Sequence, residues 1–383
     1  MRNQPELHYL SLHVPGSNGQ ARRLYERLSF STSSEEHGLL SRLTRGFISM
    51  KKKAITLAIV IVLIMLGAAL YILRQNTFDM VEQPVEISTP QGKLTGLLTL
   101  PKHASGKHGL VLFIHGDGPV NASHNDGYKP LWERLASLGF ASLSFNKRGI
   151  GGSEGNWLDQ SISDRVEEAR QALVWAREQP SIDSSRIGVW GASQAGWVIP
   201  KLAEAEPLAF SILVSPAISW LRQGAYNTEQ QMLKEGYSTD EISSQMAYEQ
   251  RVNELLQQGA AYEEYVQLDH PGKIMSRARW TFVSRNFTAD AEKDLRNFKS
   301  PLLLLLGDDD INVDVQETER VYRERILPSS LLTVKVFPDT EHSMLRTATA
   351  DSSLRATLIS LFAPRKITVE GYMEQIELFL REI

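Results

Sequence analysis

The segment Ile187–Gly196, IGVWGASQAG, is the most informative part of the sequence about the fold. An apolar strand runs into small residues and Ser193, and an apolar helical pattern follows. A serine on so tight a strand-to-helix turn exposes its hydroxyl, but the turn is cramped, so the positions two before and two after the serine must be small. Gly191 and Ala195 meet this demand, although glycine is usual at the second position. Ser193 is therefore a candidate nucleophile. The alternative is an ordinary strand-to-helix turn, because Gly, Ala and Ser are common in such turns.

Around this turn, short apolar runs alternate with helical patterns. Several runs are apolar on both faces, such as GLVLFIHG and PLLLLLGDDD, which is typical of parallel strands covered by helices. Helices are expected at 129–138 and 164–178. The pattern predicts a doubly wound α/β sheet. The expected strands are 84–89, 94–100, 109–114, 140–145, 187–190, 210–215, 302–306 and 331–337.

The segment 220–298 interrupts the alternation after the sixth strand. Its helical windows, 222–235 and 240–258, the latter capped by Thr239, predict a helical insertion. Such an insertion tends to cover the carboxyl ends of the strands, where ligands bind. We expect a lid with aromatic side chains that face an acyl group. The alternative is that they only pack the insertion onto the sheet. The candidate lid residues are Tyr226, Tyr248 and Trp280.

A glycine-containing loop, HGDGP at 115–119, directly follows the strand LVLFI. A flexible backbone here can turn an amide toward the place where an oxyanion forms, and the amide of Gln194 at the start of the next helix can supply a second donor. The loop amide is expected from Asp117 or Gly118. The alternative is an ordinary turn after a strand.

An acid and a base are expected near the end of the chain. Asp308, Asp309 and Asp310 follow the strand PLLLLL, and His342 lies in the loop after LLTVKVFP. Three adjacent carboxylates repel one another, so only one needs to face inward. A divalent-metal site is the alternative for them. His342 alone combines a position after the last strand with the chain order Ser, Asp, His.

From about residue 84 to the C-terminus the chain resembles the α/β-hydrolases, within them the bacterial branch related to dienelactone hydrolases and acyl-thioester hydrolases or esterases. Three segments carry the resemblance: HGDGPVNASHNDGYKPL, FNKRGIGGSEG with Asn146 where aspartate is common, and GDDDINV. It implies an eight-stranded, mostly parallel sheet with its second strand antiparallel. It also implies a catalytic Ser193 and His342 and, because the acid stands three residues after the glycine, Asp310.

The resulting hypothesis is a serine hydrolase that cleaves carboxylic esters through an acyl-enzyme, without cofactor or metal. A serine nucleophile disfavours the dehalogenase and epoxide-hydrolase branches, which use aspartate there. Acyl-CoA thioesterase and peptidase activities need the same three groups and stay open. The alternative from another class is a catalytically silent, membrane-tethered binding domain.

A hydrophobic run at 54–73, AITLAIVIVLIMLGAALYIL, is long enough to cross about 30 Å of hydrocarbon. The prediction is a retained single-pass anchor at 50–75 in a bacterial inner or cell membrane. Because Arg42, Arg45 and Lys51–Lys53 precede the run, the catalytic domain is expected outside the cytoplasm. The alternatives are a buried core helix and a signal peptide that starts at Met50, whose cleavage would release the protein.

Composition limits the remaining possibilities. The chain has 383 residues, a net charge of −4 and no cysteine, which excludes thiolate catalysis and disulfides. No nucleic-acid partner is expected, since no broad basic face is available. A small acyl ester and the membrane are the expected partners, with the oligomeric state left open. The expected division is a tail at 1–49, disordered or upstream of the true start, then the anchor, core segments at 84–219 and 299–383, and the lid at 220–298.

Overall fold

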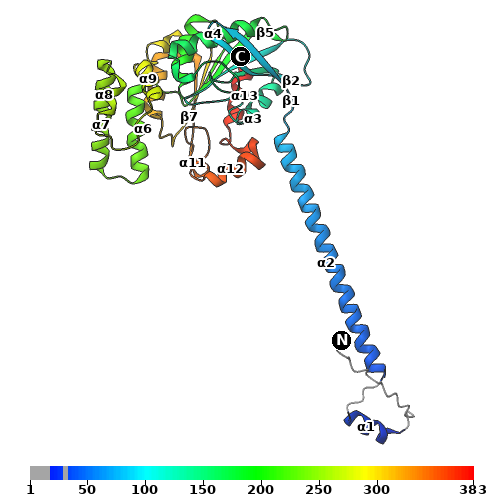
Figure 1. Ribbon diagram of the computed structural model, residues 1–383. Coiled ribbons are helices and arrows are strands. Elements are labelled where there is room, and N and C mark those ends of the chain that lie inside the picture. Colours follow the sequence, from blue (N-terminus) through cyan, green and yellow to red (C-terminus); the bar gives the residue numbers. More distant parts are fainter. Residues whose placement is uncertain (1–17, 29–32) are drawn as a thin grey trace. The chain divides into compact units, whose positions relative to one another are not determined.

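A computed structural model describes residues 18–28 and 33–383 (Figure 1). Its internal contacts divide the chain into two units, Met1–Tyr71 and Ile72–Ile383. The first contains the short helix α1 (Gly19–Arg27) and most of the long helix α2 (Ser33–Asn76). The second contains the remaining elements.

Helix α2 begins well before the expected anchor boundary at residue 50. Helix α2 contains no proline between Ser33 and Asn76, and helix propagation is cooperative, so the helix extends into the residues that precede the apolar run. Its segment Ser41–Asn76 is long and apolar enough to span a membrane, by length and composition. Of the expected tail, residues 1–17 and 29–32 lie outside the described residues.

The second unit is built on an eight-stranded sheet with the order β1-β2-β4-β3-β5-β6-β7-β8. β2 is antiparallel to both neighbours and the other pairs are parallel, which confirms the expected α/β-hydrolase sheet and all eight strands. The strands are β1 (Met80–Thr89), β2 (Gly92–Pro101), β3 (His108–Ile114), β4 (Phe140–Phe145), β5 (Ile182–Ala192), β6 (Ser211–Val214), β7 (Leu302–Gly307) and β8 (Leu332–Phe337).

Helices cover both faces of the sheet, as the doubly apolar strands require. Along β7, Leu302 and Leu304 belong to one hydrophobic core and Leu303 and Leu305 to the other, because successive side chains of a strand point to opposite faces. The first core includes residues of α4 (Ile162–Arg177), α5 (Ala195–Ala205) and α10 (Val315–Arg325). The second includes residues of α3 (Lys129–Ser137) and α13 (Tyr372–Glu382). The sheet is therefore the middle of three layers.

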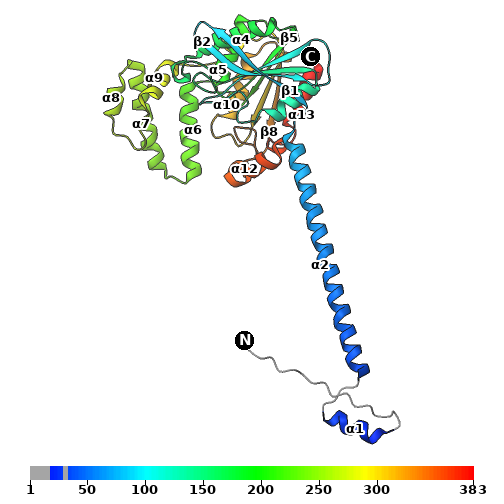
Figure 2. The same ribbon diagram turned by 45° about the vertical axis from the view of Figure 1, so that its right-hand side comes forward.

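The expected insertion lies between β6 and β7 and is helical. It consists of α6 (Trp220–Glu235), α7 (Thr239–Gln258), α8 (Tyr262–Val266), α9 (Arg277–Asn286) and the 3-10 turn η2 (Asp294–Asn297). Figures 1 and 2 both show α6 to α9 grouped beside the sheet, outside its two helix layers. The insertion has a hydrophobic core of its own, which includes Val252, Leu256, Tyr265, Trp280 and Phe282.

One helix boundary differs from the expectation. Helix α7 is capped by Ser238 rather than Thr239, which is already its first residue. The Ser238 hydroxyl accepts the amide of Glu241, and the Glu241 carboxylate accepts the amide of Ser238. This reciprocal pair fixes the start one residue earlier, since the capping side chain must stand three residues before the amide that it accepts.

Candidate active site

Ser193 occupies a strained turn between β5 and α5. Its φ is +55°, in the left-handed region that non-glycine residues rarely adopt. Backbone hydrogen bonds hold this conformation: the Ser193 amide donates to Val214 at 2.9 Å, and its carbonyl accepts from Gly196 at 2.9 Å. The turn places the serine at the carboxyl edge of the parallel strands, as the sequence indicated.

The small residues around Ser193 are required by close packing. A β-carbon on Gly191 would lie 2.6 Å from both Ala195 Cβ and Ile199 Cδ1, and one on Gly196 would lie 2.6 Å from Pro216 Cβ. Ala195 is itself fully buried. Its methyl group is tolerated because Gly191 leaves that space empty, which explains the departure from glycine at position 195.

The structure brings Asp310, after β7, together with His342, after β8. Asp310 Oδ2 lies 2.7 Å from His342 Nδ1. Asp310 Oδ1 accepts the amides of Asn312 at 2.7 Å and Val313 at 3.0 Å, and the residue is only 2% exposed. These contacts fix the carboxylate and the orientation of the imidazole ring.

The other two aspartates of the turn point elsewhere. Asp309 Oδ2 accepts the hydroxyl of Thr347 at 2.6 Å, and Asp308 Oδ1 accepts the amide of Thr340 at 3.4 Å. Both residues are exposed. The three carboxylates thus diverge, and of the three it is Asp310 that is oriented toward the histidine.

The loop after β3 lies against the serine. A β-carbon on Gly116 would lie 3.3 Å from Ser193 Cβ and 3.9 Å from its Oγ. The side chain of Gln194, the residue after the serine, donates to Asp117 Oδ1 at 3.2 Å. Among the hydrogen bonds of residues 33–383, none engages Ser193 Oγ or His342 Nε2. Both residues are half-buried, and within the described residues neither of these atoms is engaged by another side chain or by the backbone.

Three cations around this loop were not identified from the sequence. The buried Arg165, from α4, bridges the Gln194 side chain and the His115 carbonyl. The Lys147 ammonium donates to the Gly116 carbonyl at 2.6 Å. The sequence could have indicated that Arg165 is buried, because Arg165 stands four residues before Ala169 and so lies on the apolar stripe of α4. A charged residue in that position needs a buried partner.

The third cation comes from the insertion. Arg279, on α9, forms a bidentate pair with Asp117, with nitrogen–oxygen distances of 2.7 and 3.2 Å. It also lies over the rings of Trp157 and Phe282. The insertion is thereby joined to the loop that faces Ser193. No local pattern marks this contact, since the two residues are 162 positions apart.

Burial and these charges shift the ionisation of the loop. Burial raises the pKa of Asp117, but the Arg279 guanidinium, Lys147 and the Gly118 amide outweigh it, so that the pKa lies below its ordinary value. Burial, together with Arg165, lowers the pKa of Lys147 well below the ordinary lysine value. Burial also lowers the pKa of His115 to about 3, so this histidine is neutral at pH 7.

Residues 105–348, more than half of the chain, match the family described as serine aminopeptidase, S33. The chain belongs to this family of α/β hydrolases. Its eight-stranded sheet agrees with the α/β-hydrolase fold.

Individual relatives cover smaller parts. An uncharacterised protein of Mycobacterium tuberculosis is 31% identical over 141 residues, which are 37% of this chain and 48% of that protein. Dipeptidyl aminopeptidase BIII of Pseudoxanthomonas mexicana is 30% identical over 131 residues, 30% of this chain and 18% of that enzyme. The chain thus spans less than half the length of these relatives.

Solved structures share the fold at low sequence identity. An esterase of Pyrococcus furiosus is similar with a TM-score of 0.50 and 19% identity, over 79% of this chain and 91% of that one. A hypothetical protein of Pseudomonas aeruginosa is similar with a TM-score of 0.51 and 14% identity, over 80% and 95% of the two chains. At such identities the likeness concerns the fold alone.

In this α/β hydrolase the three aromatic residues expected in the lid have different surroundings. The Tyr226 hydroxyl donates to the Asp310 carbonyl at 3.1 Å, so Tyr226 adjoins the acid turn. The Tyr248 hydroxyl lies 2.7 Å from His270 Nδ1, within the insertion. Trp280 is 3% exposed and stacks on Tyr265 with ring centroids 4.5 Å apart. Trp280 is thus packed inside the insertion, the alternative considered for it, because the insertion needs an apolar core of its own.

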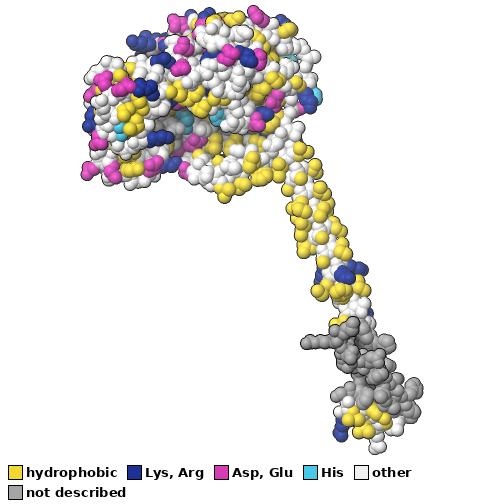
Figure 3. Space-filling model, in the orientation of Figure 1, with side chains coloured by type: hydrophobic (Ala, Val, Ile, Leu, Met, Phe, Trp, Pro, Cys, Tyr) yellow, Lys and Arg dark blue, Asp and Glu magenta, His cyan; other side chains and the backbone are white. Residues whose placement is uncertain are grey.

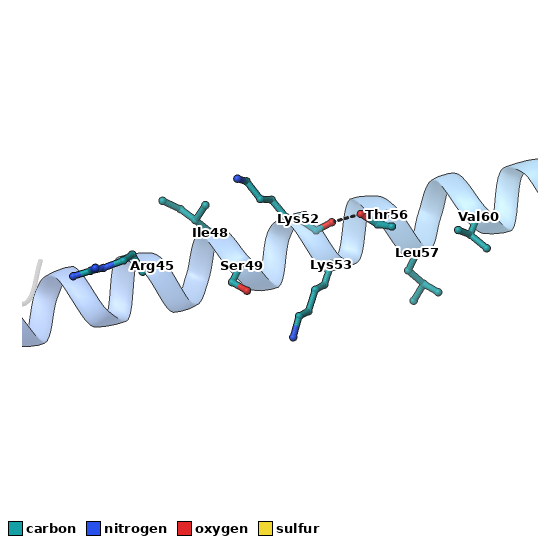
Figure 4. Close-up of a pocket in the computed structure, with 8 residues that line it drawn as sticks. All are labelled: Arg45, Ile48, Ser49, Lys52, Lys53, Thr56, Leu57 and Val60. Carbon is teal, nitrogen blue, oxygen red and sulfur yellow. Dashed lines mark hydrogen bonds between the residues drawn. The ribbon is translucent and has the colours of Figure 1, made fainter.

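A separate surface hollow lies along α2 between Arg45 and Val60 (Figure 4). One helix alone lines it, and Figure 4 shows Lys52 and Lys53 pointing to opposite sides of that helix. The hollow therefore offers no convergent set of polar groups. The residues that line the hollow include Arg45, Lys52 and Lys53, which are basic and lie on the turns of α2 before the apolar run.

Proposed function

We propose that the chain is a serine hydrolase that cleaves carboxylic esters through an acyl-enzyme, with Ser193 as nucleophile, His342 as base and Asp310 as the group that orients the base. The observation that carries the proposal is the 2.7 Å contact between Asp310 Oδ2 and His342 Nδ1. It lies at the strand ends where the strained turn presents Ser193. Nucleophile, base and orienting acid are the three roles that acyl transfer requires.

In the acylation step His342 Nε2 takes the Ser193 proton as Oγ attacks the ester carbonyl carbon. The tetrahedral oxyanion then collapses, and the alcohol leaves with the proton from Nε2. In the second step a water molecule gives a proton to Nε2 and attacks the acyl group, which releases the acid and regenerates Ser193. Asp310 keeps the ring proton on Nδ1 throughout, so that Nε2 is the basic nitrogen.

The oxyanion is assigned to backbone amides. The first is the amide of Gln194, at the start of α5, where the helix dipole adds positive potential. The second is the amide of Asp117 or of Gly118, in the loop whose Gly116 lies against Ser193. Arg165 and Lys147 act as positioning residues, since they hold the Gln194 side chain and the Gly116 carbonyl.

Peptidase activity is the second candidate, supported by the family description and by the dipeptidyl aminopeptidase relative. An aminopeptidase must pair the α-ammonium group of its substrate with an acidic side chain close to the nucleophile. Asp117 is the acidic residue of the loop beside Ser193, and its carboxylate is already engaged by Arg279 and Gln194. This pairing favours an ester or thioester without a free ammonium group at that position.

We also propose that α2 anchors the enzyme in a membrane. Arg45, Lys52 and Lys53 precede the apolar run, whereas Asp79 and Glu82 follow it, so the positive-inside rule orients the catalytic unit outside the cytoplasm (Figure 4). The second possibility is a cleaved signal sequence. The mass of the membrane-bound chain distinguishes the two, since a retained anchor preserves the residues before position 74.

A fluorophosphonate probe tests the catalytic assignment in the full chain. The probe should label the wild type and the control Ser184→Ala, which changes an exposed serine, but not Ser193→Ala. Loss of the nucleophile should lower ester turnover by about 10⁴-fold or more, because the three groups act as one unit. Appreciable turnover by Ser193→Ala would refute the assignment. A folded but unlabelled wild type would indicate the binding-domain alternative, and faster cleavage of aminoacyl amides than of esters would indicate the peptidase.

A further inference from the structure

Helix α12 (Ser353–Phe362) presents an apolar stripe to its outside. Leu354, Leu358, Leu361 and Phe362 stand at i, i+4, i+7 and i+8, the spacing that places side chains on one helical face. Their exposed fractions are 69%, 46%, 57% and 44%. In a helix that packs on a core this face would be buried.

The rest of α12 does not pack into the core either. All ten of its residues are exposed or half-buried. Arg355 is the single charged residue of the helix. Helix α12 is therefore apolar, yet none of its side chains belongs to the hydrophobic cores of the catalytic unit. A large exposed apolar face of this kind indicates a surface that another protein or a membrane covers.

The position of α12 next to the end of α2 indicates which of these covers its apolar face. Within the second unit, the last residues of α2 are bonded to the end of α12: Asn76 Nδ2 donates to the Leu361 carbonyl at 3.0 Å. The Arg365 guanidinium, just after α12, donates to the carbonyls of Arg74, Gln75 and Thr77 at 2.6 to 2.9 Å. Its charge is also paired with Glu133 at 2.7 Å. The end of α12 is thus held directly against the point where α2 ends.

The distance to the apolar run is short. Leu73 is the last residue of that run, and three residues of helix separate it from Asn76, a rise of about 4.5 Å. Because the chain is continuous, this holds whatever the direction of the preceding helix. If α2 spans a bilayer, the Leu361 end of α12 lies within about one helical turn of the hydrocarbon edge, in the headgroup region.

We propose that α12 is a second membrane contact, which lies in the interface of the bilayer with Leu354, Leu358, Leu361 and Phe362 inserted among the lipids. The inference rests on the proposed membrane anchoring by α2. An amphipathic helix of this kind buries its apolar face at the boundary of headgroups and acyl chains. Residues 352–369 contain no acidic residue, and beside the internally paired Arg365 they carry the exposed Arg355 and Lys366, which suit the anionic headgroups of a membrane surface.

The contact would also orient the catalytic edge. Helix α12 follows the loop that carries His342, and the turn before it is joined to the insertion by an ion pair of 2.6 Å between Asp351 and Lys234 of α6. Figure 3 shows hydrophobic side chains over the part of the catalytic unit to which α12 belongs, and Figures 1 and 2 show α12 at the end of that unit opposite α4. A bilayer on α12 would therefore hold this edge of the enzyme near the lipid surface.

The absence of cysteine from the sequence allows a direct test with the full chain. Single-cysteine variants Leu358→Cys on α12, Leu63→Cys in the apolar run and Val174→Cys on α4 carry an environment-sensitive dye. Val174 is the matched control, because it is 49% exposed and also lies on a helix of the catalytic unit. Each labelled protein is reconstituted into vesicles of phosphatidylcholine and phosphatidylglycerol. Urea denaturation confirms that the fold is unchanged.

We expect the dye at 358 to emit at shorter wavelength than that at 174, to lose intensity with lipids that carry a spin label near the headgroup, and to be protected from aqueous iodide. A dye at 358 that iodide quenches as strongly as the dye at 174 would overturn the inference. Protection from iodide without quenching by lipid would overturn it as well and indicate a second copy of the chain on α12. The dye at 63 tests the anchor separately, since its failure to respond to lipid would refute membrane anchoring itself.

Discussion

The substitution Asp310→Asn tests the proposed catalytic geometry most sharply. Asp310 Oδ1 accepts two amides, from Asn312 at 2.7 Å and Val313 at 3.0 Å, and Oδ2 faces His342 Nδ1. An asparagine keeps its oxygen on the two amides, so its NH2 group faces the histidine. Nδ1 must then accept a hydrogen bond, and the ring proton moves to Nε2, where the base is needed.

The size of the effect follows from the alternative orientation. If the side-chain amide of the new asparagine turned around, its oxygen would face His342 and restore the productive tautomer. The buried backbone amides of Asn312 and Val313 would then face an NH2 group and lose their acceptor, which costs about 1–3 kcal/mol for each amide. The productive form is therefore about 2–6 kcal/mol less stable, which corresponds to a loss of about 30-fold to 10⁴-fold in kcat/KM. Initial rates with a short chromogenic ester measure this loss.

The neighbouring aspartate supplies the control. In Asp309→Asn the amide oxygen can still accept the Thr347 hydroxyl, and the residue is exposed, so activity should be essentially unchanged. Urea denaturation of both variants separates a catalytic effect from unfolding. An equal loss of rate in both variants, or a loss below about tenfold in Asp310→Asn with the fold intact, would refute the reasoning.

Three further predictions concern stability. Gly191→Ala should lower the free energy of unfolding by about 1–3 kcal/mol in urea denaturation, because the added methyl group would lie 2.6 Å from Ala195 and Ile199. The control Gly224→Ala, in open space on α6, should be neutral or stabilising. Equal effects of the two substitutions would contradict the packing argument. Trp280→Ala should cost about 3–5 kcal/mol and reduce amide-exchange protection in the insertion, while an altered acyl-chain preference at unchanged stability would mean that Trp280 faces substrate. His115, whose pKa is lowered to about 3 from an unfolded value of about 6.5, should contribute stability that is complete above pH 6.5 and falls by up to about 1.4 kcal/mol per pH unit toward pH 3. His115→Gln should lose this part of the acid sensitivity and the control His103→Gln, at an exposed site, should keep it; parallel pH profiles would count against the assignment.

The sequence was sufficient for elements whose signal is local. Buried parallel strands must be apolar on both faces, so runs such as PLLLLL and LVLFI identified β7 and β3, and the steric demands of the turn at Ser193 are met by residues within three positions of it. The family pattern, in which the acid stands three residues after the glycine, predicted Asp310 rather than its two neighbours as the acid. The structure places Asp310 beside His342 because the carboxyl ends of adjacent parallel strands meet at one edge.

Contacts between segments that lie far apart in the sequence depend on the tertiary structure. Arg165 and Lys147 support the loop beside Ser193, and Arg279 reaches Asp117 from the insertion, because folding brings together side chains that share no local pattern. The same holds for α12, whose apolar spacing by itself predicts a helix packed on a core. Its stripe faces outward because both faces of the sheet are already covered by other helices, and the end of α12 is fixed instead to the last turn of α2. A sequence pattern determines which face of a helix is apolar, whereas the arrangement of its neighbours determines what that face contacts.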